Sequence, residues 1–196
     1  MNSNTYRRYF AGLLDTQARW LNRMSQQGLR LVKTGMLSFT FAPCEPGAYT
    51  YCVEYVGHLS QRKAENYKAF LEEMGYRVFF KNLNLNYAVG KVYLRPWAEK
   101  GALVGTSGTT LNKELLIVEK PDDGLPFQLH TTYEDKIRYL KHLRSPWLWM
   151  EPLFLFFALW GKQAAFCIPA ALLLIPVGFY QIEILRLRKQ AETKEW

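Results

Sequence analysis

The chain has 196 residues, a formal net charge of +8 and 49% apolar residues, a length that accommodates one ordinary domain and a smaller unit. The charge suits an acidic partner, but the basic residues are scattered among acidic ones, which argues against direct nucleic-acid binding. Three cysteines without metal-ligand spacing argue against a disulfide framework. We also expect no cleavable secretory signal, because no apolar core follows the first arginines.

Residues 1–95 predict a soluble α+β domain. Asp15 is positioned to cap an amphipathic helix, and Gly28 stands where a left-handed helix stop is favoured. Alternation of apolar and polar residues then predicts strands over 29–32, 37–42 and 49–55.

The same order of elements then recurs. Ser60 is positioned to cap a second helix, and Gly75 ends it as Gly28 ends the first. Setting these two glycines on each other also matches Arg30 with Arg77. The pattern suggests either an internal duplication or a chance likeness between two short helix–glycine–strand units. Both alternatives predict an α+β fold with two helices on one antiparallel sheet, ferredoxin-like or related.

The remaining soluble part is less regular. Residues 96–130 begin as a Gly/Thr-rich linker, and a strand pattern over 114–119 with a turn over 121–124 predicts an extra hairpin. Residues 131–145 predict a basic juxtamembrane helix that carries Lys136, Arg138, Lys141 and Arg144.

The C-terminal part is apolar enough for a membrane. Residues 164–184 provide about 20 mostly apolar residues, the length that crosses a hydrocarbon core. Residues 147–160 are apolar over a shorter stretch, which suits either a second span or an interfacial helix. Because Trp147, Trp149 and Trp160 bracket this stretch as interfacial aromatics do, a transmembrane helical hairpin over 146–186 is predicted.

Basic residues flank the apolar part on both sides, whereas Lys162 is the only one between its two halves. The positive-inside rule then predicts a multi-pass protein of the cell membrane, with the soluble domain, both termini and a basic tail over 187–196 in the cytosol. The alternative, a single span after an interfacial helix, would place the soluble domain and Trp196 on opposite sides.

No combination of residues in the sequence predicts an enzyme. The three histidines lie in different predicted elements, and the sequence lacks hydrolase, metalloprotease and dinucleotide-binding motifs. We therefore expect no catalytic residue, cofactor or metal. Glu151 is a speculative polar site within the membrane zone, and it is the only specific support for a lipid-active enzyme. A carboxylate near the headgroups is the simpler interpretation.

Residues 10–95 carry a pattern with a family resemblance. Trp20, Leu21, Asn22 and Met24 are followed by Gly28 and then by an aromatic strand and a Pro-Gly turn. In this the chain resembles the bacterial domain-of-unknown-function family 2812. The resemblance implies a soluble domain followed by a juxtamembrane segment and a pair of transmembrane helices, often encoded beside PadR-type transcriptional regulators. It implies no enzymatic activity.

These observations favour a non-enzymatic, membrane-tethered regulatory or adaptor protein whose cytosolic domain binds a protein partner. A PadR-type regulator or a membrane permease is the expected partner, alongside the lipid bilayer. The alternative function is that of an accessory subunit of a membrane transporter.

Overall fold

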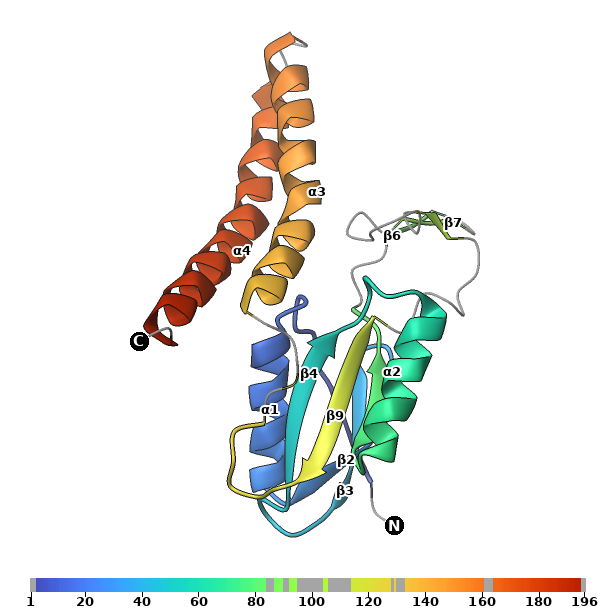
Figure 1. Ribbon diagram of the computed structural model, residues 1–196. Helices are drawn as coiled ribbons and strands as arrows, with labels where there is room; N and C mark the ends of the chain where they lie inside the picture. Colours follow the sequence, from blue (N-terminus) through green and yellow to red (C-terminus); the bar gives the residue numbers. More distant parts are fainter. Residues whose placement is uncertain are drawn as a thin grey trace. The chain divides into compact units, whose positions relative to one another are not determined.

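The structure, a computed structural model, describes residues 3–83, 87–89, 92–94, 104–105, 114–127, 129, 133–160 and 164–194. The chain divides into two compact units (Figure 1). The first, here called the α+β unit, comprises residues 1–95 and 99–130, and the second, the helical unit, comprises residues 96–98 and 131–196.

The first sheet of the α+β unit is antiparallel with strand order β1-β3-β2. Its strands are β1 (Asn4–Arg7), β2 (Leu29–Thr34) and β3 (Ser38–Pro43). The sequence did not predict β1, because four exposed residues are too few to show a period. In β2 the register shifts between Leu31 and Lys33, so a bulge places Val32 at the surface.

The second sheet is also antiparallel, with strand order β4-β9-β5. Its strands are β4 (Tyr49–Tyr55), β5 (Arg77–Lys81) and β9 (Leu115–Pro121). The predicted strand over 114–119 is confirmed as β9, which is buried from Leu115 to Glu119. Such an unbroken buried run is typical of a strand covered on both faces.

The strands therefore do not form the single sheet expected from the sequence. β5 does not continue into a hairpin with the next strand, because β9 from far along the chain pairs with it instead. A small third sheet has the order β6-β7-β8, with β6 (Tyr87–Val89), β7 (Val92–Leu94) and β8 (Val104–Gly105). The helix–glycine–strand order does recur, but the hairpin that should follow it does not.

Two helices flank these sheets, α1 (Leu14–Gln26) and α2 (Gln61–Glu73). Gly28 and Gly75 have φ angles of +76° and +87°, which confirms the left-handed stops. Ser60 caps α2 by accepting from the Lys63 amide at 3.4 Å. The predicted Asp15 cap is wrong, because Asp15 lies inside the first turn of α1, where the helix dipole still favours an acidic side chain.

Each helix buries a different face. α2 covers the face of the second sheet that carries Val78, Leu116 and Val118, and the pair Ala64 and Leu71 fills this core from the helix. The opposite face of that sheet meets β2, and α1 lies beside β4 (Figure 1).

Trp20 anchors α1 on the first sheet. Its ring meets Phe39 and Phe41 of β3 edge-on, with centroids 5.0 and 5.6 Å away, and Phe10 completes the cluster at 5.4 Å. Edge-to-face contacts of this kind add to the stabilisation from apolar burial.

α1 also covers the outer edge of β4, as a neighbouring strand would. Asn22 donates to the Tyr51 carbonyl at 3.1 Å and accepts from the Tyr51 amide at 2.6 Å. One turn later, Ser25 makes the same exchange with Tyr49, at 2.6 and 3.3 Å. Asn22 and Ser25 lie three residues apart on α1 and so face the same way. Together they satisfy the outward amides and carbonyls of Tyr51 and Tyr49 on β4.

The helical unit contains α3 (Tyr133–Trp160), a short 3-10 helix (Ala164–Phe166) and α4 (Cys167–Lys194). α3 and α4 pack side by side (Figure 1). The predicted juxtamembrane helix and the first apolar stretch are one continuous helix, which runs through Pro146 and Pro152. Proline removes one backbone donor and bends a helix without necessarily ending it.

Among the described residues, one helical segment is long and apolar enough to cross a bilayer. It is Cys167–Thr193, which contains a stretch of 18 residues with a mean hydropathy of 1.8. This segment overlaps the span predicted over 164–184.

We expect Asn22→Ala to destabilise the α+β unit by about 2 kcal/mol, because the Tyr51 amide and carbonyl lose their partner. Hydrogen exchange of β4 in the detergent-solubilised chain, followed by mass spectrometry, measures this. The control is Arg23→Ala on the exposed side of the same helix, expected to change stability by less than about 0.5 kcal/mol. Equal exchange in both variants would show that Asn22 does not protect this edge.

Candidate functional site

A buried carboxylate lies between the two sheets of the α+β unit. Tyr51 and Arg77 are both register partners of Glu119, so the three side chains form one row on the face turned toward β2. The Glu119 side chain is only 1% exposed. A buried charge is costly unless it is paired and hydrogen-bonded, so its partners determine whether this arrangement is stable.

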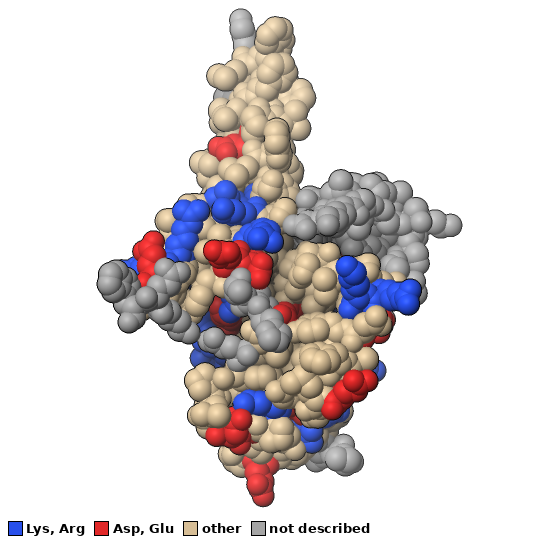
Figure 2. All heavy atoms as spheres, in the orientation of Figure 1, with Lys and Arg blue, Asp and Glu red and all other residues tan. Residues whose placement is uncertain are grey.

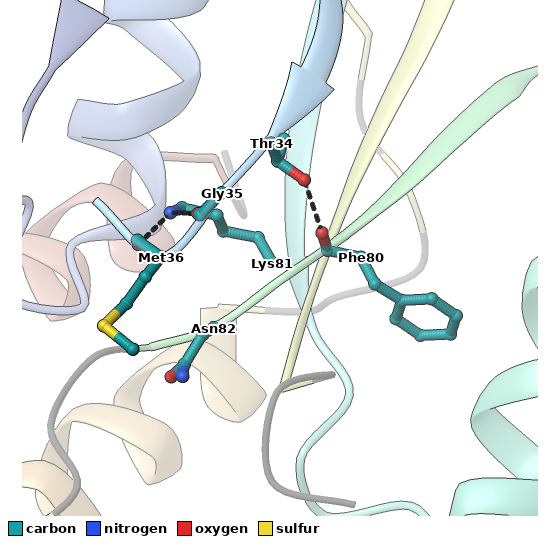
Figure 3. A pocket seen from close by; sticks show the side chains of 6 residues that line it. All are labelled: Thr34, Gly35, Met36, Phe80, Lys81 and Asn82. Carbon is teal, nitrogen blue, oxygen red and sulfur yellow. Dashed lines mark hydrogen bonds between the residues drawn. The ribbon is translucent and has the colours of Figure 1, made fainter. Parts of the chain in front are cut away.

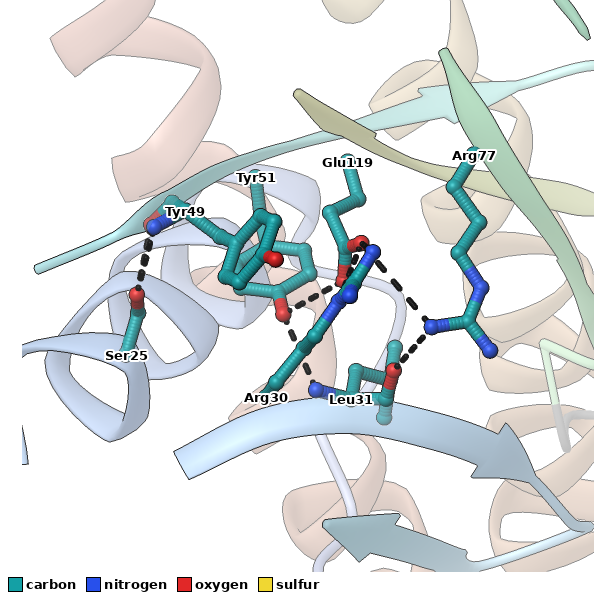
Figure 4. A network of polar contacts seen from close by, with 7 residues as sticks. All are labelled: Ser25, Arg30, Leu31, Tyr49, Tyr51, Arg77 and Glu119. Atoms are coloured by element: carbon teal, nitrogen blue, oxygen red, sulfur yellow. Dashed lines mark hydrogen bonds and ion pairs between the residues drawn. The ribbon is translucent and has the colours of Figure 1, made fainter. Parts of the chain in front are cut away.

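Three neighbours satisfy this carboxylate (Figure 4). Arg30 of β2 donates to Oε1 of Glu119 from Nε at 2.8 Å and from Nη2 at 2.7 Å. The Tyr51 hydroxyl donates to Oε2 at 2.8 Å, and Arg77 Nη1 lies 4.0 Å from Oε1. The hydrogen bond to Glu119 raises the pKa of Arg30, and burial raises the pKa of Tyr51. The guanidinium of Arg30 also lies 3.9 Å from the centroid of the Tyr49 ring.

The same row covers the outer edge of β2. The Leu31 amide donates to the Tyr51 hydroxyl at 2.9 Å, and Arg77 Nη1 donates to the Leu31 carbonyl at 3.3 Å. Side chains of one sheet thus satisfy the backbone of an edge strand in the other. The fixed geometry and full set of partners indicate a structural role for this network.

A pocket of about 200 Å³ lies where the turn after β2 approaches the end of β5 (Figure 3). Its lining consists of Thr34, Gly35, Met36, Phe80, Lys81 and Asn82. Lys81 is 4% exposed, and its ammonium donates to the carbonyls of Gly35 and Met36. The ammonium also lies 4.6 Å from the centroid of the Phe39 ring.

Burial lowers the pKa of Lys81 to about 8. Near neutral pH its amine is therefore protonated in most molecules. The other five lining residues are not ionisable, so the pocket offers one cation and several polar groups. This composition suits contact with a polar or anionic ligand better than paired acid–base chemistry.

The predicted signature residues all have structural roles in the α+β unit. Trp20 and Leu21 are buried, and Asn22 pairs with β4. Gly28 combines its positive φ with close packing, because a Cβ there would lie 3.0 Å from the Cys44 carbonyl oxygen.

The predicted membrane-interface residues all belong to α3. Trp149 and Trp160 are 78% and 81% exposed, whereas Trp147 and Glu151 are half-buried. Within the described ranges, no group of three or more His, Cys, Asp or Glu side chains is arranged to hold a metal ion.

The sequence analysis did not identify Glu119 or Lys81 as site residues. One signal was available for the first. Arg30 and Arg77 hold matching places two residues after Gly28 and Gly75, and both reach Glu119. Each helix is thus followed by a glycine and, two residues later, by an arginine, and both arginines lie beside the Glu119 carboxylate. Lys81 gave no such signal, because its burial depends on the distant turn after β2.

The fold and these sites define an α+β protein with two interacting antiparallel sheets and an apolar C-terminal helix. The model of the family described as "Protein of unknown function (DUF2812)" matches residues 14–151, so the chain belongs to this family. The match covers α1 through most of α3. No curated protein and no solved structure matches the chain.

The low pKa of Lys81 predicts a pH-dependent stability. The unfolded state binds this proton more tightly, so the folded state is penalised below about pH 8 and the penalty disappears as the pH rises toward 10.5. Unfolding of the detergent-solubilised chain and of Lys81→Met, compared across this range, isolates the effect of Lys81. The difference in unfolding free energy should grow in favour of the unsubstituted chain as the pH rises. A constant difference would contradict burial of Lys81.

Proposed function

We propose that the chain is a non-enzymatic, membrane-tethered regulatory or adaptor protein whose α+β unit binds a protein partner in the cytosol. The observation that carries this proposal is the apolar outer surface of both long helices. Soluble monomers rarely expose contiguous apolar patches of more than a few hundred Å². Lipid or other apolar helices would cover this surface.

The exposed large apolar side chains extend along both helices of the helical unit. They are Leu148, Trp149, Met150, Leu153, Leu155, Phe156, Phe157, Leu159 and Trp160 on α3, with Ile168, Leu172, Leu174, Ile175, Phe179, Ile182 and Leu185 on α4. Figure 2 shows uncharged side chains over most of the visible face of these helices. The pair thus presents apolar surface outward, as a lipid-embedded pair would.

The distribution of charge supports a transmembrane hairpin with both ends in the cytosol. Lys141 and Arg144 precede the apolar part of α3, and Arg186 and Arg188 follow that of α4. Because α3 and α4 pack side by side and a short segment joins them, these basic residues gather at the end opposite the connection. The positive-inside rule assigns such an end to the cytosol.

The α+β unit supports binding more than catalysis. Its buried carboxylate is held by structural partners, and its pocket contains a single ionisable side chain. A regulator or adaptor requires no more than a stable fold and an accessible surface.

The apolar outer surface also suits an accessory subunit of a membrane transporter, because α3 and α4 would pack against larger spans. This second candidate predicts a permease as the stable partner. The first predicts a cytosolic protein such as a PadR-type regulator.

The hairpin proposal predicts that a reporter after Trp196 is cytosolic and that one inserted at Lys162 is external. Alkaline phosphatase and fluorescent-protein fusions in a bacterial membrane measure both positions, because each reporter is active on one side only. A reporter after Arg95 serves as the cytosolic reference. An external signal after Trp196 would contradict the hairpin and favour a single span.

The partner proposal predicts that crosslinking in intact membranes, followed by affinity capture of the full chain, retains a transcription factor or a permease. A chain with its α+β unit replaced by an unrelated soluble domain is the control. Loss of the captured protein in this control assigns binding to the α+β unit, and retention assigns it to the helices. Capture of neither class would contradict both candidate functions.

A further inference from the structure

Side chains cover three of the four outer edges of the two principal sheets. The edge of β4 meets Asn22 and Ser25, and the edge of β2 meets Tyr51 and Arg77. At the edge of β5, the Thr34 hydroxyl donates to the Phe80 carbonyl at 2.7 Å. Covering edges in this way prevents unwanted strand pairing.

The fourth edge belongs to β1 and is different. All four residues of β1 are exposed, and no described strand of the α+β unit pairs with its outer side. The Arg8 amide donates to the Leu37 carbonyl at 3.0 Å, so Arg8 faces β3. In an antiparallel pair, successive residues of a strand direct their amide and carbonyl alternately toward the partner strand and away from it. The amides and carbonyls of Thr5 and Arg7 therefore point away from β3. Their amides and carbonyls form a row that another strand can use.

The surroundings of this edge are basic and partly apolar. Arg7 and Arg8 lie at its end, and residues 1–14 contain no acidic residue. Tyr9 and Leu37 are exposed beside it, at 52% and 42%. Aromatic and arginine side chains are enriched in protein interfaces.

We propose that the outer edge of β1 binds an extended acidic segment of a protein partner, which adds to the first sheet as a further strand. Main-chain hydrogen bonds to Thr5 and Arg7 supply affinity, and acidic side chains beside Arg7 supply selectivity. A second copy of the chain fits this edge less well, because antiparallel pairing of two β1 strands through their outward residues would set each Arg7 opposite Thr5 and supply no acidic side chain. The inference rests on the proposed function, since it names the surface through which the α+β unit binds its partner.

A matched pair of variants tests the hydrogen-bonding edge. Thr5→Pro and Thr5→Val both lose the hydroxyl contact with Thr40, but only Thr5→Pro loses the outward amide. Proline is tolerated on edge strands when its nitrogen faces outward, so the first sheet should remain intact. Hydrogen exchange of β3 in both variants checks this.

A second pair tests the charge. Arg7→Glu reverses the charge at the edge, and Arg62→Glu makes the same change on the exposed side of α2. The probe is a fluorescent peptide of alternating Glu and Val, roughly ten residues long, the length of a long strand. The same peptide with Lys in place of Glu is its control.

With the full chain in detergent, we expect the acidic peptide to bind at least about tenfold more tightly than the basic one by fluorescence anisotropy. It should also slow hydrogen exchange of residues 3–9. Thr5→Pro and Arg7→Glu should each weaken binding by about tenfold or more, whereas Thr5→Val and Arg62→Glu should not.

Equal binding of the two peptides, or equal binding by all four variants, would overturn the proposal. A dimer in analytical ultracentrifugation that Thr5→Pro dissociates would overturn it in favour of a second copy. If membrane crosslinking captures a partner equally well with Thr5→Pro and Thr5→Val, the adaptor function stands and the β1 site fails. If the peptide binds as expected but crosslinking captures no partner, the adaptor function fails instead.

Discussion

The contact between Arg30 and Glu119 is the constraint on which the arrangement of the α+β unit depends. It joins an edge strand of one sheet to the central strand of the other, inside a region where an unpaired carboxylate would cost several kcal/mol. Tyr51 completes the network by bonding both the carboxylate and the backbone of β2. Because these bonds require one register of β2 against the second sheet, the network specifies geometry as well as contributing stability.

Side chains also hydrogen-bond to the backbone at the outer edges of β4 and β5, where a neighbouring strand would otherwise pair. Asn22 and Ser25 on α1 satisfy β4, which explains an asparagine within the family pattern as a structural residue. A helix attached in this way has a fixed rotation, so Trp20 is directed onto the aromatic rings of β3. Among the four outer edges of the two principal sheets in the described residues, these contacts leave that of β1 accessible.

The helical unit obeys a different constraint. Both of its helices expose large apolar side chains, and most of its basic residues lie outside the apolar stretches. α3 continues from the basic segment into the apolar one without a break, so the two predicted segments form one helix. The basic residues at the start of α3 and the apolar residues at its end therefore belong to the same helix.

The sequence by itself determined the local features: both helices of the α+β unit, the stops at Gly28 and Gly75, the strand β9 and the apolar character of α4. Periodicity, capping and hydropathy report these because each depends on neighbouring residues. Only the tertiary structure decided which strands share a sheet, since β9 pairs with β4 and β5 across long stretches of chain. It also decided the burial of Glu119 and Lys81, whose partners on β2 and its following turn become neighbours only when the two sheets meet.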